Sequence, residues 1–150
     1  MNFAIVGATG NVGRKTIDIL EKSKLKIDNL FLVASKKSSG KKLSFKRKKI
    51  KIIALEEYNF SKAQITFFAA GSAIAKKWAP IAAKKTIVID NSKYFRMNKD
   101  IPLVVPEVNE NALKNYKKNN IIANPNCSTA QLVVALKPLH DKFRIKRVVV

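Results

Sequence analysis

A single cysteine, Cys127, stands in the sequence NPNCST at 124–129, and its surroundings favour a role as a nucleophile. A short strand is predicted before this segment and a helix over 128–139 after it. The thiol is therefore expected at a helix N-terminus, where unpaired N–H groups and the helix dipole stabilise a thiolate. The alternative is a small buried hydrophobic side chain, as many lone cysteines are. Flanking asparagine and proline predict an exposed turn and favour the nucleophile.

Three glycines in GATGNVG at 7–13 predict a dinucleotide-binding turn, with the spacing GxxGxxG rather than the common GxGxxG. The motif follows an apolar strand over 3–6 and opens a helix over 11–22. Glycine permits a tight turn and lets backbone N–H groups approach a pyrophosphate at the positive end of the helix. The alternative is a strand-to-helix turn without a ligand. The position directly after the first strand favours the dinucleotide.

The end of the second predicted strand, over 30–34, indicates NADP(H) rather than NAD(H). An NAD site usually has an acidic residue there, which binds the ribose 2′-hydroxyl. This chain instead has SKKSSG at 35–40, whose hydroxyl and ammonium groups suit a 2′-phosphate. Asp28 precedes the strand and is expected at the opposite end of the sheet. A basic loop without a ligand is the alternative, since lysine is frequent throughout the chain.

A thiol nucleophile beside a nicotinamide site predicts the oxidation of an aldehyde. Addition of the Cys127 thiol gives a hemithioacetal, which gives up hydride and leaves a thioester. We expect no metal ligands in this site.

Short apolar runs that alternate with helical patterns predict a Rossmann-like α/β fold, a doubly wound, mostly parallel sheet with helices on both faces. The expected strands cover 3–6, 30–34, 50–55, 65–69, 86–89, 121–123 and 144–150, with an extended segment over 103–105. The expected helices cover 11–22, 73–84 (interrupted or kinked by Pro80), 109–118 and 128–139. A domain seldom ends inside a strand. We therefore expect a cofactor domain over 1–150, with the start of a second, α+β domain for substrate and dimerisation near 128–150.

The composition fits one domain with a hydrophobic core, since 47% of the 150 residues are hydrophobic. The net charge of +20 is typical of a nucleic-acid binder. Only five of the 30 cations are arginine, however, and frequent lysine, asparagine and isoleucine also result from an AT-rich coding sequence. The densest basic stretch, 36–51, is predicted to be a solvated loop and an edge strand. Without a signal peptide or an apolar run of about 20 residues, we expect a cytoplasmic protein with neither a membrane nor a nucleic-acid partner.

Five motifs in order closely resemble the bacterial type of aspartate-semialdehyde dehydrogenase. They are GATGNVG at 7–13, FFAAGSAIAKKWAP at 67–80, VIDNSKYFRM at 88–97, PLVVPEVN at 102–109 and NPNCSTAQLVVALKPL at 124–139. The related N-acetyl-glutamyl-phosphate reductases share the architecture, but NPNCST fits the semialdehyde enzymes better. The resemblance implies the reversible, NADPH-dependent conversion of aspartyl phosphate to aspartate semialdehyde and phosphate, on the way to lysine, threonine and methionine.

The resemblance also implies roles for individual residues. Cys127 is the nucleophile, Asn126 lies beside the reacting carbonyl, and Arg96 binds the phosphate or acyl-phosphate group, which suits its planar guanidinium. Asn91 is a second substrate residue. The implied cofactor contacts are Gly7, Thr9, Gly10, Asn11, Val12, Gly13, Ser35, Lys37, Ser38, Ala70, Gly71 and Ser72. Lys37 stands where the family often has arginine, which weakens the expected preference for NADP.

The resemblance places the general acid/base beyond position 150, where the family has a histidine, a glutamine and a further arginine. His140 cannot replace them, because it lies about 20 Å from Cys127 along the same predicted helix. The full-length protein is expected to be a homodimer. Two other interpretations stay open: an NADP-binding module without catalysis, and a nucleic-acid-binding protein that uses the basic stretch 36–51.

Overall fold

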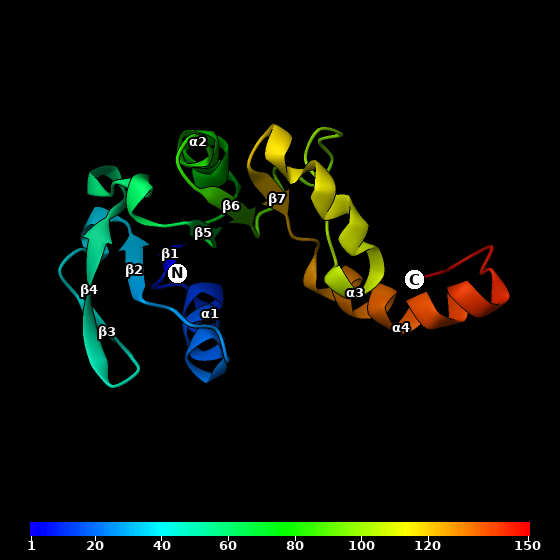
Figure 1. Ribbon diagram of the computed structural model, residues 1–150, viewed down its shortest axis with the longest axis horizontal. Helices are drawn as coiled ribbons and strands as arrows, with labels where there is room; N and C mark the ends of the chain where they lie inside the picture. The colour runs from blue at the N-terminus through cyan, green and yellow to red at the C-terminus, as the bar shows by residue number, and fades with distance from the viewer.

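The computed structural model describes residues 1–150 and contains one seven-stranded sheet in the order β3-β4-β2-β1-β5-β6-β7 (Figure 1). The strands are β1 (Asn2–Val6), β2 (Asn29–Ala34), β3 (Lys42–Phe45), β4 (Lys48–Ala54), β5 (Ile65–Phe68), β6 (Ile87–Asp90) and β7 (Ile121–Ala123). Every neighbouring pair is parallel except β3 and β4, which form an antiparallel hairpin. The predicted Rossmann-like architecture is confirmed.

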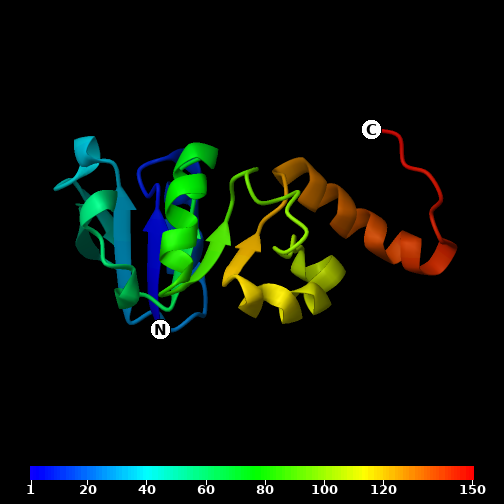
Figure 2. The ribbon, with the colours of Figure 1, turned by 90° about the horizontal axis from the view of Figure 1, so that it is seen from above.

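Two helices, α1 (Asn11–Lys22) and α2 (Ser72–Ala83), lie on opposite faces of the sheet (Figure 1). The short helix α3 (Pro106–Asn109) lies between β6 and β7 in the chain, and α4 (Cys127–Phe143) follows β7 and projects away from the sheet (Figure 2). Four 3-10 segments complete the structure: η1 (Lys36–Ser38), η2 (Leu55–Glu57), η3 (Phe60–Lys62) and η4 (Glu110–Lys118). No helix is both long and apolar enough to cross a membrane.

The central strand β1 is buried on both faces, as expected of a parallel sheet that helices cover on both sides. Phe3 and Ile5 belong to the hydrophobic cluster that includes α1, whereas Ala4 and Val6 belong to the cluster that includes α2. The buried residues of α2 are all alanine, which lets this helix approach the sheet closely. The two clusters hold β1 and the loop that follows it in a fixed position.

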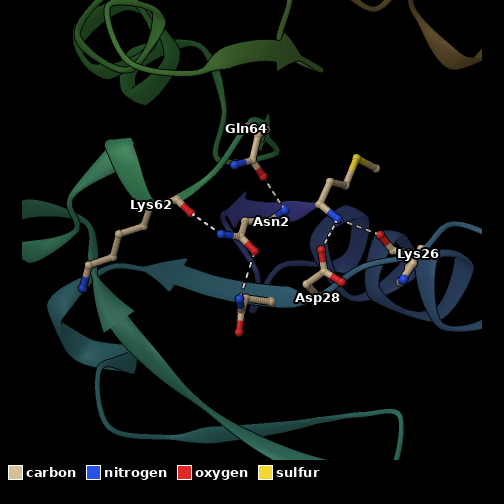
Figure 3. Close-up of polar contacts among 7 residues, drawn as sticks. Asn2, Lys26, Asp28, Lys62 and Gln64 are labelled. Atoms are coloured by element: carbon tan, nitrogen blue, oxygen red, sulfur yellow. Dashed lines mark hydrogen bonds and ion pairs between the residues drawn. The ribbon is translucent and has the colours of Figure 1, made fainter.

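Polar contacts join the edge of the sheet where the parallel strands begin (Figure 3). The side-chain amide of Asn2 donates to the carbonyl oxygen of Lys62 at 3.1 Å and accepts from the amide of Asn29 at 2.9 Å. The backbone N–H of Asn2 donates to the side chain of Gln64. Asp28 binds the N-terminal ammonium group at this same edge. As expected from its place before β2, Asp28 lies opposite the loops that follow the strands.

Three expected elements differ from the structure. The strand predicted over 144–150 is wrong: Arg144 adopts a left-handed conformation (φ 56°) that ends α4, and no strand follows. The outer side of β7 is already occupied, because Ala123 forms a bridge with Leu103. The helix predicted over 109–118 is mostly the 3-10 segment η4, and α2 runs through Pro80 without interruption.

Candidate active site

A cavity of about 350 Å³ opens where β1, β2, β4 and β5 end. It is lined by Val6, Gly7, Thr9, Gly10, Ala34, Ser35, Leu55, Glu56, Ala69, Ala70 and Ile74. In open α/β sheets, ligands bind outside the carboxyl ends of the strands. The glycine motif therefore lies at the position expected of a nucleotide site.

The three glycines of the motif differ in what the fold requires of them. Gly7 has φ 87°, and a Cβ atom there would lie 2.6 Å from the carbonyl oxygen of Ala69. A Cβ atom on Gly13 would lie 2.2 Å from the carbonyl oxygen of Gly7, so this glycine lets α1 start close to β1. A Cβ atom on Gly10 would meet only the Gly7 oxygen, at 3.4 Å. Packing thus explains Gly7 and Gly13, whereas Gly10 mainly keeps the cavity open.

The N-terminus of α1 is open to an anion. Gly10 is its N-cap residue and supplies no side-chain hydrogen bond. The first N–H groups of a helix have no partner within it, so those of Asn11, Val12 and Gly13 suit the oxygens of a diphosphate. The donor set and the room beside Gly10 fit a dinucleotide.

The other predicted cofactor residues divide into two groups. Thr9, Ser35 and Ala70 line the cavity. Lys37 and Ser38 lie in η1, directly after Ser35, and do not line it. Gly71, with φ 83°, caps α2, and Ser72 is the first residue of that helix; neither lines the cavity.

Six cavity residues escaped the sequence prediction: Val6, Ala34, Leu55, Glu56, Ala69 and Ile74. Leu55 and Glu56 follow β4, which pairs with β2 so that Ala54 lies opposite Ala34. The loops after β2 and β4 therefore meet at one edge. The sequence did contain a signal for Glu56. An acidic residue that binds the ribose can come from the end of β2 or from the end of β4, its parallel neighbour.

Cys127 is the first residue of α4 and is exposed. The side-chain oxygen of its neighbour Asn126 accepts from the N–H and the hydroxyl of Ser128, both at 3.1 Å, and from the Cys127 thiol at 3.4 Å. The backbone donor fixes which amide atom is the oxygen. The Nδ2 group of Asn126 makes no hydrogen bond within the chain and is free to donate to a ligand.

Arg96 joins the loops that follow β6 and β7. Its Nε donates to the backbone carbonyl oxygen of Asn124 at 2.9 Å. One of its terminal nitrogens, Nη2, donates to the backbone carbonyl oxygen of Asn91 at 3.1 Å. The amide of Asn124 also donates to the side-chain oxygen of Asn91 at 2.7 Å. The guanidinium carries five N–H donors, so three remain for a substrate anion.

Asp90, at the end of β6, is fully buried next to this network. Its carboxylate accepts from the N–H of Ser92 at 3.1 Å and from the hydroxyl of Ser92 at 2.6 Å. Burial raises the pKa of Asp90, although the bonds from Ser92 and the charge of Arg96 oppose that rise. The side chain thus fixes the turn that carries Asn91 and Arg96.

The cofactor residues and the residues around Cys127 lie at the same end of the sheet, where the parallel strands end. The glycine loop follows β1, the turn 70–72 follows β5, Asn91 follows β6 and Cys127 follows β7. Three inter-strand spacings separate β1 from β7, which is about 14 Å. His140 lies near the far end of α4, where its carbonyl oxygen accepts from the N–H of Arg144 at 2.8 Å. It is therefore far from Cys127, as predicted.

Comparison with known proteins places this edge in context. Residues 2–116 match the family described as semialdehyde dehydrogenase, NAD binding domain. An aspartate-semialdehyde dehydrogenase of Aquifex aeolicus (strain VF5) is 54% identical over 149 residues, which are 98% of this chain and 44% of that protein. This chain therefore spans less than half the length of the curated relatives it matches.

Solved structures show the same similarity. Aspartate semialdehyde dehydrogenase II from Vibrio cholerae, complexed with ASA, has a TM-score of 0.92 and 49% identity, over 93% of this chain and 46% of that one. Aspartate semialdehyde dehydrogenase with NADP from Candida albicans has a TM-score of 0.78 and 31% identity, over 95% of this chain and 47% of that one.

Proposed function

Because this chain belongs to the semialdehyde dehydrogenase family through its NAD-binding domain, we propose that it is the cofactor-binding and nucleophile-bearing part of an aspartate-semialdehyde dehydrogenase. The observation that carries the proposal is the position of Cys127. It begins α4 at the same edge of the sheet as the glycine-lined cavity. A thiol nucleophile and a nicotinamide site on one edge are what thiol-dependent aldehyde oxidation requires.

The chain binds a nicotinamide cofactor, and our proposal is NADP(H). The support is chemical, since the turn after β2 offers the hydroxyl of Ser35 in the cavity and then Lys36, Lys37 and Ser38 beside it. Hydroxyl and ammonium groups suit a 2′-phosphate. The N–H groups at the start of α1 would bind the diphosphate.

Cys127 performs the covalent steps. In the direction of aldehyde oxidation, its thiolate sulfur bonds to the carbonyl carbon of aspartate semialdehyde, and the oxygen takes up a proton. When bound, the nicotinamide supplies the hydride acceptor. The hemithioacetal carbon then loses a hydride and its hydroxyl loses a proton, which leaves a thioester on Cys127. Attack by a phosphate oxygen breaks the carbon–sulfur bond, releases aspartyl phosphate and restores the thiolate.

Two other side chains act on the substrate in this proposal. The free Nδ2 group of Asn126 donates to the carbonyl oxygen as negative charge develops on it, which lowers the barrier. The remaining N–H donors of Arg96 bind the phosphate, because a guanidinium pairs with two oxygens at once. Asn91 fixes Arg96 and contributes to the substrate site. The proton of the hemithioacetal hydroxyl goes to a base from a part of the protein beyond residue 150.

The proposal extends to the whole protein. The chain is the cofactor domain, and a second domain for substrate and dimerisation begins within 128–150. The full-length enzyme is a cytoplasmic homodimer that supplies semialdehyde for the synthesis of lysine, threonine and methionine. The length of the relatives supports a second domain, since this chain covers 44% of the Aquifex protein.

The test uses the protein at the length its source produces. We expect phosphate-dependent reduction of NADP⁺ with aspartate semialdehyde, followed at 340 nm, and little with N-acetylglutamate semialdehyde. Cys127→Ser is expected to abolish turnover, while a fluorescence titration still detects NADPH binding. Turnover that survives this substitution would overturn the nucleophile, and a preference for the N-acetylated substrate would assign the related reductase reaction instead.

A further inference from the structure

Glu56 is the only charged residue that lines the cofactor cavity. The basic residues of the neighbouring turn, Lys36 and Lys37, do not line it. The acidic residue that is missing after β2 is thus supplied by the turn after the adjacent strand, β4.

The fold explains why Glu56 is brought there. Ala54 pairs with Ala34 in the parallel register of β4 and β2, so both strands end at the same level. Leu55, the next residue, is buried in the core on the α2 side of the sheet. Glu56 follows in the turn η2, is exposed, and lines the same cavity as Ser35.

The carboxylate of Glu56 is free to interact with a ligand. The chain has three ion pairs, and none of them includes Glu56. An ionised carboxylate only accepts hydrogen bonds. It therefore attracts the ribose hydroxyls of NAD(H) and repels the 2′-phosphate of NADP(H).

We propose that Glu56 is a specificity-determining residue that favours NAD(H) in this cavity and so limits the preference for NADP(H). The inference rests on the proposed function, because it assumes that the cavity holds the adenosine half of the cofactor. The Glu56 carboxylate opposes the effect of Ser35 and of the lysines after β2 on cofactor preference. The balance between these groups decides how well each cofactor binds.

The experiment measures dissociation constants for NADPH and NADH by fluorescence titration of the protein at its natural length. Glu56→Gln removes the charge and keeps the shape of the side chain. Glu57→Gln is the matched control, because it removes the same charge from the next residue, which is exposed and does not line the cavity. We expect Glu56→Gln to shift the ratio of the two constants toward NADPH by about tenfold and Glu57→Gln to leave that ratio unchanged.

Three results would overturn the inference. One is a ratio that Glu56→Gln changes no more than Glu57→Gln does. Another is an equal loss of affinity for both cofactors, which would mean that Glu56 contacts a part they share. The third is a wild-type protein that binds neither cofactor, which would overturn the cofactor site itself. The first two leave the proposed function intact.

Discussion

Arg96 and Asn124, 28 residues apart in the chain, are joined by a hydrogen bond of 2.9 Å from the guanidinium Nε to the backbone oxygen. Asn124 stands three residues before Cys127. The cation proposed to bind phosphate therefore also fixes the loop that carries Cys127, the proposed nucleophile. In the proposed mechanism, phosphate binding and the position of Cys127 thus depend on the same side chain.

Arg96→Lys is expected to reduce kcat/KM by about a hundredfold, since a small misplacement of the nucleophile has an effect of this size. Lysine keeps the charge but cannot donate to Asn91 and Asn124 in the planar geometry of the fork. The rate of Cys127 alkylation by iodoacetamide should change as well. Arg47→Lys, in the exposed β3–β4 turn, is the control and should leave both rates unchanged. An unaltered alkylation rate in the Arg96 variant would mean that Arg96 does not position Cys127 and serves only to bind phosphate.

Two substitutions of Asn126 separate its two functions. Asn126→Asp retains an oxygen that accepts from the Ser128 N–H but removes the Nδ2 donor, so we expect normal stability and a lower kcat. Asn126→Ala removes both and should also reduce the free energy of unfolding by about 1 kcal/mol, a usual effect of losing an N-cap. Thermal denaturation and steady-state kinetics measure the two effects. Full activity of the Asp variant would mean that the amide donor has no catalytic role.

The glycines of the cofactor loop should respond differently to alanine. In Gly13→Ala the new Cβ atom would lie 2.2 Å from the Gly7 oxygen, a backbone atom, so one of the elements must shift. We expect a loss of about 3 kcal/mol or more, at the upper end of overpacking effects. Gly10→Ala should fold normally and bind NADPH more weakly, because its methyl group enters the cavity lining. Urea denaturation and NADPH titration give the two quantities; equal stability of the two variants would contradict the packing argument.

The buried Asp90 predicts a pH dependence of stability. Because burial raises its pKa in the folded protein, the folded state binds a proton more tightly than the unfolded state does. This contribution to stability is complete below the ordinary aspartate pKa and is lost as the pH rises through the raised value. Asp90→Asn removes it and retains an oxygen for Ser92. Relative to that variant, the wild type should therefore lose melting temperature as the pH rises through this window; parallel melting curves would show that Asp90 titrates normally.

The sequence predicted the features that depend on local patterns. The helix over 11–22 and the strand over 121–123 are confirmed to the residue, because apolar spacing and the glycine turn define them. A strand over 50–55 was predicted where β4 lies, but the β3–β4 hairpin was not, because the stretch 36–51 was expected to be a solvated loop and an edge strand. The turn of this hairpin consists of Lys46 and Arg47, with φ 46° and 64°. Such turns usually contain asparagine and glycine, so no turn signal marked it.

The parts of the site that depend on tertiary contacts could not be predicted from the sequence. The motifs identified Cys127 and the glycine loop, and the family they indicated is confirmed. They carried no sign that Arg96 bonds to Asn91 and Asn124, because backbone oxygens have no residue signature. The apolar residues at 144–150 satisfied the strand pattern, but a strand also needs an unoccupied neighbour, and Leu103 already borders β7.

The strand β7 has three residues and pairs with β6 alone among the strands, whereas β1 pairs with both β2 and β5. Peripheral elements with few contacts open at a lower free energy than the centre of a fold. Cys127, the proposed nucleophile, thus follows a peripheral strand, whereas the glycine loop follows a central one, and the peripheral strand is expected to open at the lower free energy. Under the proposed function, dilute denaturant would abolish catalysis at Cys127 before it abolished nucleotide binding at the glycine loop.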